Sequence, residues 1–369
     1  MRVFTLQGTD IVEADTLPQA LPATGFVWIA CARREFEVQQ AAVQLCLQNL
    51  CNTSLVELHI ADLLNNQLPS HYDYTSQYDL LVFRRLSAGN AESDLAQPGV
   101  PLHASQHKGG PQVLKHIDTS PVGFAVFDRV LLTVHPSDCA VRDAYAGRLL
   151  SAAASDVRMQ GARVPSSPAD LMLRIVNLMV DGYLDLRREI TRQLDHWQTE
   201  LLNPKTRHMN WSLLLDTRLG LHQLDEICED QRAAVQDWID ALETWPDAST
   251  PQGMREQDLL AVRSRDVLEH IERVVHHVRR MEQSAETAVQ MHFSAQSNRT
   301  NDIMRTLTAL TAIFLPLNLV TGIFGMNFEF LPIIHQRGGF WWAIAIMVTI
   351  AVSMGSIFWR KRYLARTRA

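Results

Sequence analysis

Gly325-Met326-Asn327 lies in the fifteen-residue connection between two apolar runs near the C-terminus of the chain. The runs are residues 307–324 and 340–359, and each is long enough to cross a bilayer core of about 30 Å as a helix. A short polar connection between two such spans is where a membrane pore would meet an aqueous phase. The tripeptide therefore indicates passage of an ion rather than catalysis.

A stripe of side chains follows one helical face of the first run and of the segment just before it, at three- or four-residue spacing. Its members are Asn301, Met304, Leu307, Thr311, Leu315, Asn318 and Phe324. An amide oxygen can accept from the water shell of a hard cation, and a ring of Leu or Met can close a narrow path by dewetting. Mg²⁺ loses its water reluctantly, so uncharged amide rings suit the hydrated ion. The same residue types also simply pack helices together in membranes, and the stripe alone does not separate the two interpretations.

Other chemistry is weakly indicated. Fourteen histidines suggest zinc, cobalt or nickel, which imidazole prefers over Mg²⁺. Their densest group is His270, His276 and His277, but no cysteine or carboxylate stands beside it at firm ligand spacing, so solvated polar residues are the favoured interpretation. The chain has no nucleophile motif, phosphate loop or dinucleotide fingerprint. It is predicted not to be an enzyme and to carry no prosthetic group.

Composition divides the chain in two. Of its 369 residues, 20% are charged and the formal net charge is -6, but residues 307–359 carry almost no charge. Mild acidity without a basic stripe excludes a nucleic-acid partner. The first residues lack a long apolar segment, so no signal peptide is expected. The five cysteines contain no CxxC pair and are interpreted as free thiols of a cytosolic region.

Basic residues predict the orientation. Five of them follow the second span closely: Arg360, Lys361, Arg362, Arg366 and Arg368. Such a cluster belongs on the cytoplasmic side of the membrane. Two spans return the chain to its starting side, so both termini are predicted to be cytoplasmic, and the 325–339 loop faces outside.

The N-terminal part is predicted to be mixed α/β. Runs rich in β-branched and aromatic residues predict strands at 2–6, 26–31, 80–86, 123–127 and 130–134, the last two as a hairpin. Helical periodicity predicts helices at 35–49 and 138–154. Residues 88–112 are rich in Gly, Pro and Ser and are expected to form a mobile loop.

Long helices are predicted to follow, at 168–202, 205–244 and 254–324, with breaks at Asn203-Pro204 and before Pro246. The last would be about 100 Å long and would tie the cytoplasmic part mechanically to the first span. A helix of that length needs support from the same chain or from other subunits. Two spans cannot enclose a path, so a pore must form at a symmetry axis between several subunits.

The predicted organisation has seven parts. They are a cytoplasmic α/β domain at 1–165, long antiparallel helices at 166–252, a stalk helix at 253–302, a pore-lining span at 303–324, an external loop at 325–339, a second span at 340–359 and a basic cytoplasmic tail at 360–369.

The stretch from Asn301 to Asn327, NDIMRTLTALTAIFLPLNLVTGIFGMN, resembles the CorA family of divalent-cation transporters. The shared features are the two terminal spans, the proline inside the first span, the GMN tripeptide and the basic tail. Over about the last 70 residues the resemblance rests on specific motifs, and before them it rests only on the order of the predicted domains and helices. It implies a funnel-shaped homopentamer in the lipid of the bacterial inner (plasma) membrane, with Mg²⁺ or another divalent cation as substrate and possible regulatory ligand.

The resemblance also implies roles for individual residues. Gly325, Met326 and Asn327 would form the outer selectivity ring. Asn318 would form a further polar ring, Met304 and Leu307 the hydrophobic constriction, and Asn301 the inner mouth. Intracellular metal would close the pore through acids between cytoplasmic domains, for which Asp266 and, in the α/β domain, Asp79 are the candidates.

One departure from the family affects the choice of ion. The family loop usually carries an acid after its proline, but Ile333-Ile334 follow Pro332 here, and only Glu329 remains before it. Losing five carboxylates would weaken the concentration of cations at the entrance. Three hypotheses stay open. The first is a Mg²⁺ channel, and the second is a Zn²⁺, Co²⁺ or Ni²⁺ transporter of the same fold, with or without the proton coupling of the related ZntB zinc transporters. The third is a membrane-anchored structural or signalling protein without a pore.

Overall fold

The protein is described by a computed structural model that divides into two compact units, Met1–Glu286 and Thr287–Ala369. The structure describes residues 1–8, 10–88, 117–136, 139–154, 164–183, 186–188, 190–192, 194–195, 211–246, 248–326 and 338–360. The first unit is described here. The expected mobile loop at 88–112 lies outside the described residues, apart from residue 88.

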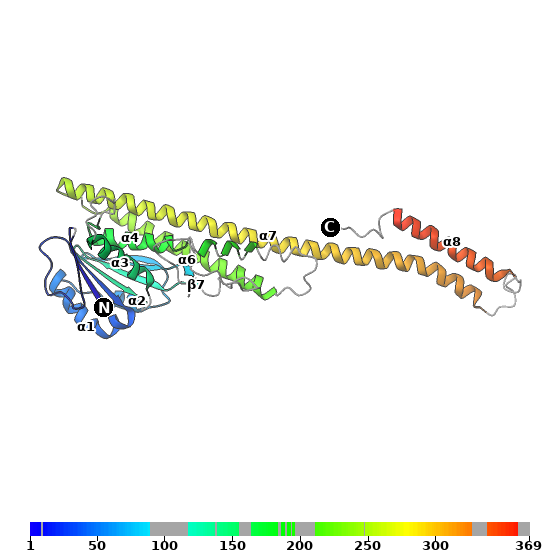
Figure 1. The fold of residues 1–369 in the computed structure, drawn as a ribbon, viewed down its shortest axis with the longest axis horizontal. Helices are drawn as coiled ribbons and strands as arrows, with labels where there is room; N and C mark the ends of the chain where they lie inside the picture. The colour runs from blue at the N-terminus through cyan, green and yellow to red at the C-terminus, as the bar shows by residue number, and fades with distance from the viewer. Residues whose placement is uncertain are drawn as a thin grey trace. The chain divides into compact units, whose positions relative to one another are not determined.

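A seven-stranded sheet with the strand order β2-β1-β3-β9-β8-β5-β4 forms the centre of the first unit. Figure 1 shows its strands as arrows between α1 on one side and α3 on the other. The strands are β1 (Arg2–Gln7), β2 (Asp10–Ala14), β3 (Phe26–Ala32), β4 (His71–Tyr74), β5 (Asp79–Arg84), β8 (Pro121–Val126) and β9 (Val130–His135). A separate pair joins β6 (Ser87–Ala88) to β7 (Ile117–Asp118). Within the described sheet β3 and β9 pair in parallel, and the other neighbours are antiparallel.

All five predicted strands are present, and β8 and β9 form the predicted hairpin, in which Val126 faces Leu131. Sequence analysis missed β2 and β4, which are the two edges of the sheet. Both are short and have few buried residues, so neither has the run of apolar residues that marks a central strand.

Helices cover both faces of the sheet. Alternate residues of β3 point to opposite sides: Trp28 lies in one core cluster and Ile29 in the other. α1 (Arg33–Cys51) and α2 (Glu57–Leu64) pack over the Ile29 side, whereas α3 (Ala140–Ala154) and α4 (Pro168–Asp181) contribute to the Trp28 side. The predicted helices at 35–49 and 138–154 are confirmed as α1 and α3, and α2 was not predicted.

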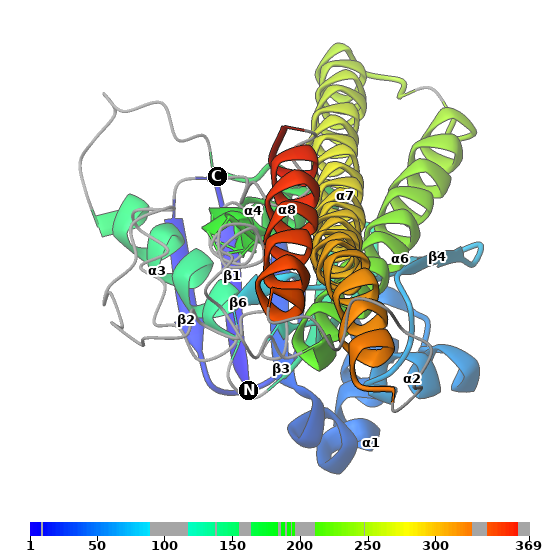
Figure 2. The same cartoon turned by 90° about the vertical axis from the view of Figure 1, so that its right-hand side faces the viewer.

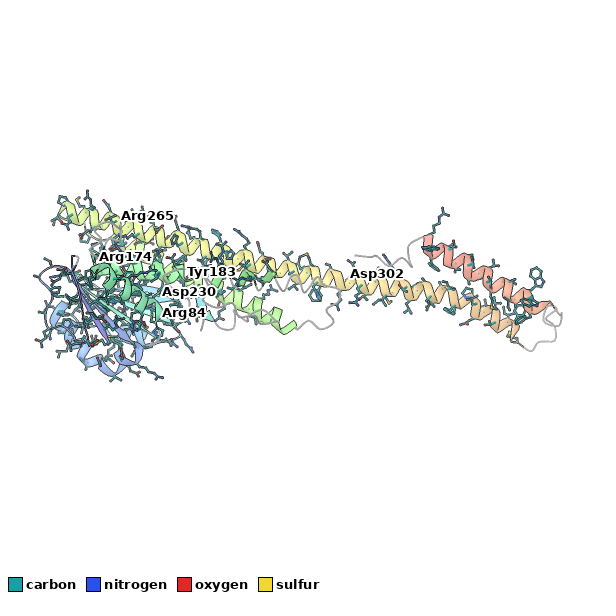
Figure 3. All side chains as sticks on the ribbon, viewed as in Figure 1. Arg84, Arg174, Tyr183, Asp230, Arg265 and Asp302 are labelled. Carbon is teal, nitrogen blue, oxygen red and sulfur yellow. The ribbon has the colours of Figure 1, made fainter. Side chains whose placement is uncertain are left out.

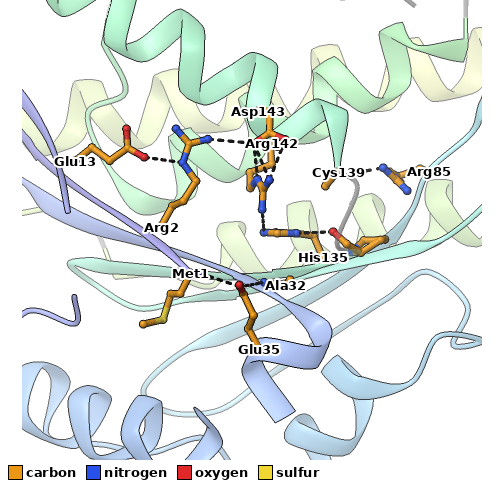
Figure 4. Close-up of polar contacts among 11 residues, drawn as sticks. Met1, Arg2, Glu13, Ala32, Glu35, Arg85, His135, Cys139, Arg142 and Asp143 are labelled. Atoms are coloured by element: carbon orange, nitrogen blue, oxygen red, sulfur yellow. Dashed lines mark hydrogen bonds and ion pairs between the residues drawn. The ribbon is translucent and has the colours of Figure 1, made fainter. Parts of the chain in front are cut away.

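Polar contacts tie the sheet to α3 (Figure 4). Arg2 of β1 pairs with Glu13 of β2 at 2.6 Å and with Asp143 of α3 at 3.0 Å. Next to them His135 donates from Nδ1 to the Pro136 carbonyl at 2.8 Å and accepts at Nε2 from Arg142 at 3.4 Å. Burial lowers the pKa of His135 to about 4, so this imidazole is neutral at physiological pH.

α6 (Trp211–Glu243) and α7 (Pro251–Phe324) run side by side in the first unit (Figure 2). The indole of Trp238 donates to the Ser264 hydroxyl at 3.0 Å, and both residues are buried. Further along, Arg279 of α7 pairs with Asp225 of α6 at 3.1 Å and also with Glu229. The predicted break at Pro246 and the continuous helix through 254–324 are both confirmed.

The predicted single helix at 168–202 is interrupted at one residue, Gly182. α4 ends at Asp181 and Gly182 is a turn residue, but Gly182 keeps right-handed helical backbone angles and its amide donates to the Leu178 carbonyl at 3.2 Å; residues 183, 186–188, 190–192 and 194–195 are helical again. Glycine in a helix interior costs about 1 kcal/mol relative to alanine, which makes it a natural place for an interruption. The predicted break at Asn203-Pro204 and the start at 205 lie outside the described residues.

Asp170 fixes the start of α4 against α7, and its loss is expected to be costly. The side chain is 4% exposed and pairs with Arg174 at 3.3 Å and with Arg263 of α7. Asp170→Asn leaves two guanidinium groups with a neutral partner, so we expect it to lower the free energy of unfolding by about 3 kcal/mol. Denaturant unfolding of the purified protein, followed by circular dichroism, measures this loss.

Ser167→Ala is the matched control for Asp170→Asn. The Ser167 hydroxyl accepts from the Asp170 backbone amide at 3.2 Å and caps the same helix. Removing the cap alone is expected to cost about 1 kcal/mol. Equal losses in the two variants would contradict a stabilising role for the Asp170 ion pairs.

Candidate ion pathway

Two described helices are long and apolar enough to cross a membrane: the C-terminal part of α7, and α8 (Gly339–Arg360). Only 6% of the most apolar window of each helix is buried within the chain. Apolar helices left this uncovered require either lipid or other protein chains around them. Both helices coincide with the runs from which the two spans were predicted.

The predicted stripe lies on an exposed part of α7, where Ile303 and Leu310 outside the stripe are also 61% and 50% exposed. Met304, Leu307 and Leu315 are 57%, 56% and 70% exposed. Asn301, Thr311 and Asn318 are exposed as well. At 3.6 residues per turn these six fall within an arc of about 120°, whereas Phe324 lies about 100° outside the nearest edge of that arc, so its predicted place on the stripe is wrong. Ala309, outside that arc, is fully buried.

Threonine hydroxyls along this part of α7 bond back to their own helix. Thr308 donates to the Met304 carbonyl at 2.8 Å, and Thr311 donates to the Leu307 carbonyl at 2.9 Å. The hydroxyl proton is therefore satisfied inside the helix. The oxygen lone pairs remain free to accept from water on the outward face.

The only charged side chains in residues 301–326 are Asp302 and Arg305, which lie 3.9 Å apart at the start of the stripe (Figure 3). Asp302 is displaced by about 100° around the helix from Asn301, so it lies off the stripe. Sequence analysis did not single out this pair. Its signal is an acid and a base three residues apart, directly before the first apolar run.

α7 ends at Phe324, directly before the GMN tripeptide. The Gly325 amide donates to the Thr321 carbonyl at 2.9 Å, and the Met326 amide donates to the Ile323 carbonyl at 3.3 Å. A Cβ at Gly325 would lie 3.1 Å from the Thr321 carbonyl oxygen, so this position favours glycine. Asn327 and Glu329 lie outside the described residues.

The two predicted regulatory acids occupy different places in the first unit. Asp79, on β5, lines a cavity of 1140 Å³ and accepts a hydrogen bond from the Tyr72 hydroxyl at 2.5 Å. Asp266, on α7, lines another cavity of 470 Å³ together with Asn177 and Asp181. The structure therefore does not bring Asp79 and Asp266 into one cavity of the described chain.

Asp266 has polar neighbours that sequence analysis did not identify. Its carboxylate lies 3.9 Å from His270 Nε2, and His270 Nδ1 is 3.0 Å from the Asn177 amide oxygen. Burial raises the pKa of nearby Asp181, and the charge of Asp266 raises it further. Asn177 and Asp181 are far from Asp266 along the chain, so no spacing pattern points to them.

The histidines do not assemble into a metal centre within the described residues. No group of three or more His, Cys, Asp or Glu side chains there is close enough to hold an ion. His270 is engaged with Asn177, and burial lowers the pKa of His277 to about 4. The interpretation of this group as ordinary polar residues is consistent with both findings.

Asp79 and Asp73 are expected to affect stability with opposite dependence on pH. Burial, with help from Asp128, raises the pKa of Asp79 above the ordinary 3.8. Burial opposes ionisation of Asp73, but its hydrogen bonds with His59 and the Tyr74 amide lower its pKa overall. Stability from Asp79 is therefore lost as the pH rises through its folded pKa, whereas stability from Asp73 is lost as the pH falls.

Thermal unfolding measured from acidic to neutral pH tests these two opposite pH dependences. We expect Asp79→Asn to raise the melting temperature at neutral pH and to leave it unchanged in acid. Asp73→Asn is expected to lower the melting temperature at neutral pH, with a smaller effect in acid. Shifts of the same sign in the two variants would contradict the electrostatic account.

The described elements define a mixed α/β unit with long helices, followed by two candidate C-terminal spans. The family model for the CorA-like Mg²⁺ transporter protein matches residues 36–362 of this chain. The chain belongs to this family. The predicted family is thereby confirmed, and because its members are transporters, so is the prediction that the chain is not an enzyme.

Two characterised relatives show how far the sequence similarity extends. The cobalt/magnesium transport protein CorA of Thermotoga maritima is 27% identical over 194 residues, which are 53% of this chain and 52% of the relative. The magnesium transport protein CorA of Haemophilus ducreyi is 24% identical over 253 residues, 68% of this chain and 73% of the relative. The match thus spans about half the length of the Thermotoga protein.

Two solved structures share the fold over nearly the whole chain. The complete CorA magnesium transporter of Methanocaldococcus jannaschii superposes with a TM-score of 0.65 at 17% identity, covering 97% of both chains. The full-length CmaX protein gives a TM-score of 0.57 at 18% identity, covering 98% of this chain and 97% of that one. At these identities the likeness supports the fold alone.

Proposed function

We propose that this protein carries divalent cations, above all Mg²⁺, into the cell through a homopentameric pore lined by α7. The observation that carries the proposal is the exposed stripe from Asn301 to Asn318, on an apolar helix that is followed directly by the GMN tripeptide. Membership in a family of Mg²⁺ transporters supports the class of substrate.

Exposure of the stripe favours assembly around an axis. An asparagine amide facing hydrocarbon would leave several hydrogen-bonding positions without a partner, which costs several kilocalories per mole. Turning the same face of each copy toward a common axis places the amides and threonine oxygens around water instead. The second span, α8, then faces lipid with Trp341, Trp342 and Trp359 near its ends.

In the proposed path Mg²⁺ keeps its shell of water molecules throughout. Gly325, Met326 and Asn327 form the outer ring, where the Asn327 amide accepts from the bound water. Asn318, Thr311 and Asn301 supply further oxygens along α7, and Met304, Leu307 and Leu315 form the apolar segments between them. No carboxylate lines this face among the described residues, so the ion keeps its shell and leaves easily.

The membrane potential supplies the driving force. A dication crossing a potential of 100 mV releases about 4.6 kcal/mol, twice the value for one elementary charge. We place residues 1–302 and the basic tail in the cytoplasm of a bacterial cell and the loop at 325–339 outside the inner membrane. Inward flow then needs no further energy source.

Intracellular metal is proposed to close the pore through Asp266 and Asp79. Because the two acids line different cavities of one chain, a site that includes both requires a second copy. Asp266 has Asp181 close by, and a bound cation would relieve the repulsion between the two carboxylates. Metal would then stabilise one arrangement of neighbouring cytoplasmic parts.

A second candidate keeps the fold and changes the ion to Zn²⁺, Co²⁺ or Ni²⁺, with coupling to protons. The observation that favours it is the loop sequence Pro332-Ile333-Ile334, which lacks an acid at the outer entrance. The name of the Thermotoga relative includes cobalt as well as magnesium.

A competitive flux assay separates the two candidates. Purified protein in liposomes is offered Mg²⁺, Zn²⁺, Co²⁺ and Ni²⁺ together, with and without a proton gradient. We expect Mg²⁺ uptake that responds to membrane potential and is indifferent to the proton gradient. Zinc uptake that exceeds magnesium uptake and follows the proton gradient would favour the second candidate, and absence of all flux would leave only a membrane anchor.

A further inference from the structure

A large open cavity lies on the first unit, apart from the proposed ion path. It has a volume of 1140 Å³ and is bounded by the β4–β5 hairpin, the β8–β9 turn, the end of α6 and the first turns of α4 and α7. Six carboxylates line it: Asp73, Asp79, Asp128, Asp237, Asp240 and Glu256. Its described lining contains no lysine, arginine or histidine, so the cavity carries a strong negative charge.

Aromatic rings form a second, independent feature of the same cavity. The rings of Tyr72 and Tyr74 are stacked with their centroids 6.2 Å apart. Behind the cavity lining, the buried Trp238 meets both Tyr72 and Trp245 edge-on, each at 5.8 Å, and so holds these two lining rings in place. Tyr74 is 68% exposed, so its ring is accessible to a ligand in the cavity.

Asp73 is bound by His59 at 3.1 Å, but the nearby arginines are directed away from the cavity. Arg129 follows Asp128 in the chain but donates to the Gly25 and Pro22 carbonyls, at 2.9 and 2.5 Å. Arg255, next to Glu256, lines a different cavity. Among the described residues neither Asp128 nor Asp237 has an ion pair with a lysine, arginine or histidine.

The carboxylates are too dispersed for a single metal ion. No group of three of them is close enough to hold a metal among the described residues. A hydrated inorganic cation would also gain nothing specific from aromatic rings. Separated negative charges and intervening rings instead match a long ligand, whose ammonium groups are attracted by carboxylates and by ring faces, and whose methylene segments pack on apolar surface.

We propose that this cavity binds a linear organic polycation of the polyamine class. Its ammonium groups lie at Asp128 and at the α6 carboxylates Asp237 and Asp240, and its methylene chain lies along Tyr72, Tyr74 and Trp245. Such a ligand touches the sheet, α6 and α7 together, so its binding stabilises the packing of the α6–α7 turn against the sheet. The inference does not depend on the proposed transport of Mg²⁺.

Calorimetric titration of the full-length protein in detergent with spermidine tests the proposal. Asp128→Asn removes one unpaired charge, and Asp258→Asn on α7 is its control because Asp258 is exposed outside the cavity lining. Tyr74→Leu removes one ring, and Tyr74→Phe keeps it. We expect saturable binding that Asp128→Asn and Tyr74→Leu each weaken about three- to tenfold, in line with cation–π and exposed charge contributions. The two controls are expected to bind as the unchanged protein does.

Competition with Mg²⁺ at matched ionic strength completes the test. We expect millimolar Mg²⁺ to displace little spermidine, because the rings select for the organic cation. Absence of saturable spermidine binding overturns the proposal. It is also overturned if Tyr74→Leu has no effect while Mg²⁺ displaces spermidine completely, because the cavity is then a general attractor of inorganic cations.

Discussion

Asn327→Ala is expected to reduce Mg²⁺ uptake into proteoliposomes by about 70-fold or more. In the proposed homopentamer one substitution removes five amides from the outer ring. A hydrogen bond contributes about 0.5–1.5 kcal/mol, so five of them contribute about 2.5 kcal/mol even at the lower limit. That difference corresponds to about 70-fold in occupancy or rate. Uptake is measured with a fluorescent Mg²⁺ indicator inside the liposomes, under an inside-negative potential.

The control for this variant is Asn298→Ala. Asn298 is an exposed asparagine on the same helix, and it lies about 60° around the helix from the nearest edge of the stripe. Its replacement removes the same chemical group without touching the proposed path, so uptake is expected to stay close to that of the unchanged protein. Size-exclusion chromatography checks that both variants assemble alike. Normal uptake by an assembled Asn327→Ala protein would rule out Asn327 as the selectivity residue.

The stripe could be predicted from sequence because a long regular helix has a fixed angular step. Once α7 is helical, Asn301, Thr311 and Asn318 must share a face whatever surrounds them. The central strands β3 and β9 were predictable for a similar reason, since each is a run of buried residues. The edge strands β2 and β4 have no fully buried residue, so they lack the run of apolar side chains by which a strand is predicted.

The surroundings of the two regulatory candidates could not be predicted. Asn177 reaches His270, next to Asp266, across 93 positions of the chain, and only the packing of α4 against α7 brings them together. Asp79 was chosen from sequence as an acid of the α/β domain, but its hydrogen bond with Tyr72 depends on the β4–β5 pairing. Such contacts are set by tertiary structure and leave no local spacing signal. The one-residue interruption of the predicted 168–202 helix at Gly182 did have a local signal, the glycine itself. The helical periodicity on both sides of Gly182 favoured a continuous helix, so the interruption was not predicted.

Leu307→Asn is expected to produce a pore that no longer closes. In the proposed path Leu307 and Met304 form the constriction, which stops flow by excluding water rather than by blocking the path with a bulky group. Burying a leucine side chain away from water is worth about 1.5–3 kcal/mol, and five asparagines would hold water where five leucines expel it. The barrier in the closed state is expected to fall by more than the roughly 1.4 kcal/mol that gives a tenfold faster leak.

The leak is measured as Mg²⁺ uptake into liposomes already loaded with millimolar Mg²⁺, a condition in which intracellular metal is proposed to close the unchanged protein. Leu310→Asn provides the control, because Leu310 is 50% exposed and lies about 60° outside the stripe on the same helix. It introduces the same polar group away from the proposed axis, so loaded liposomes should remain closed. If both variants stay closed, the constriction is not at Leu307, and if both leak equally, the added amide acts by loosening the helices rather than by wetting the pore.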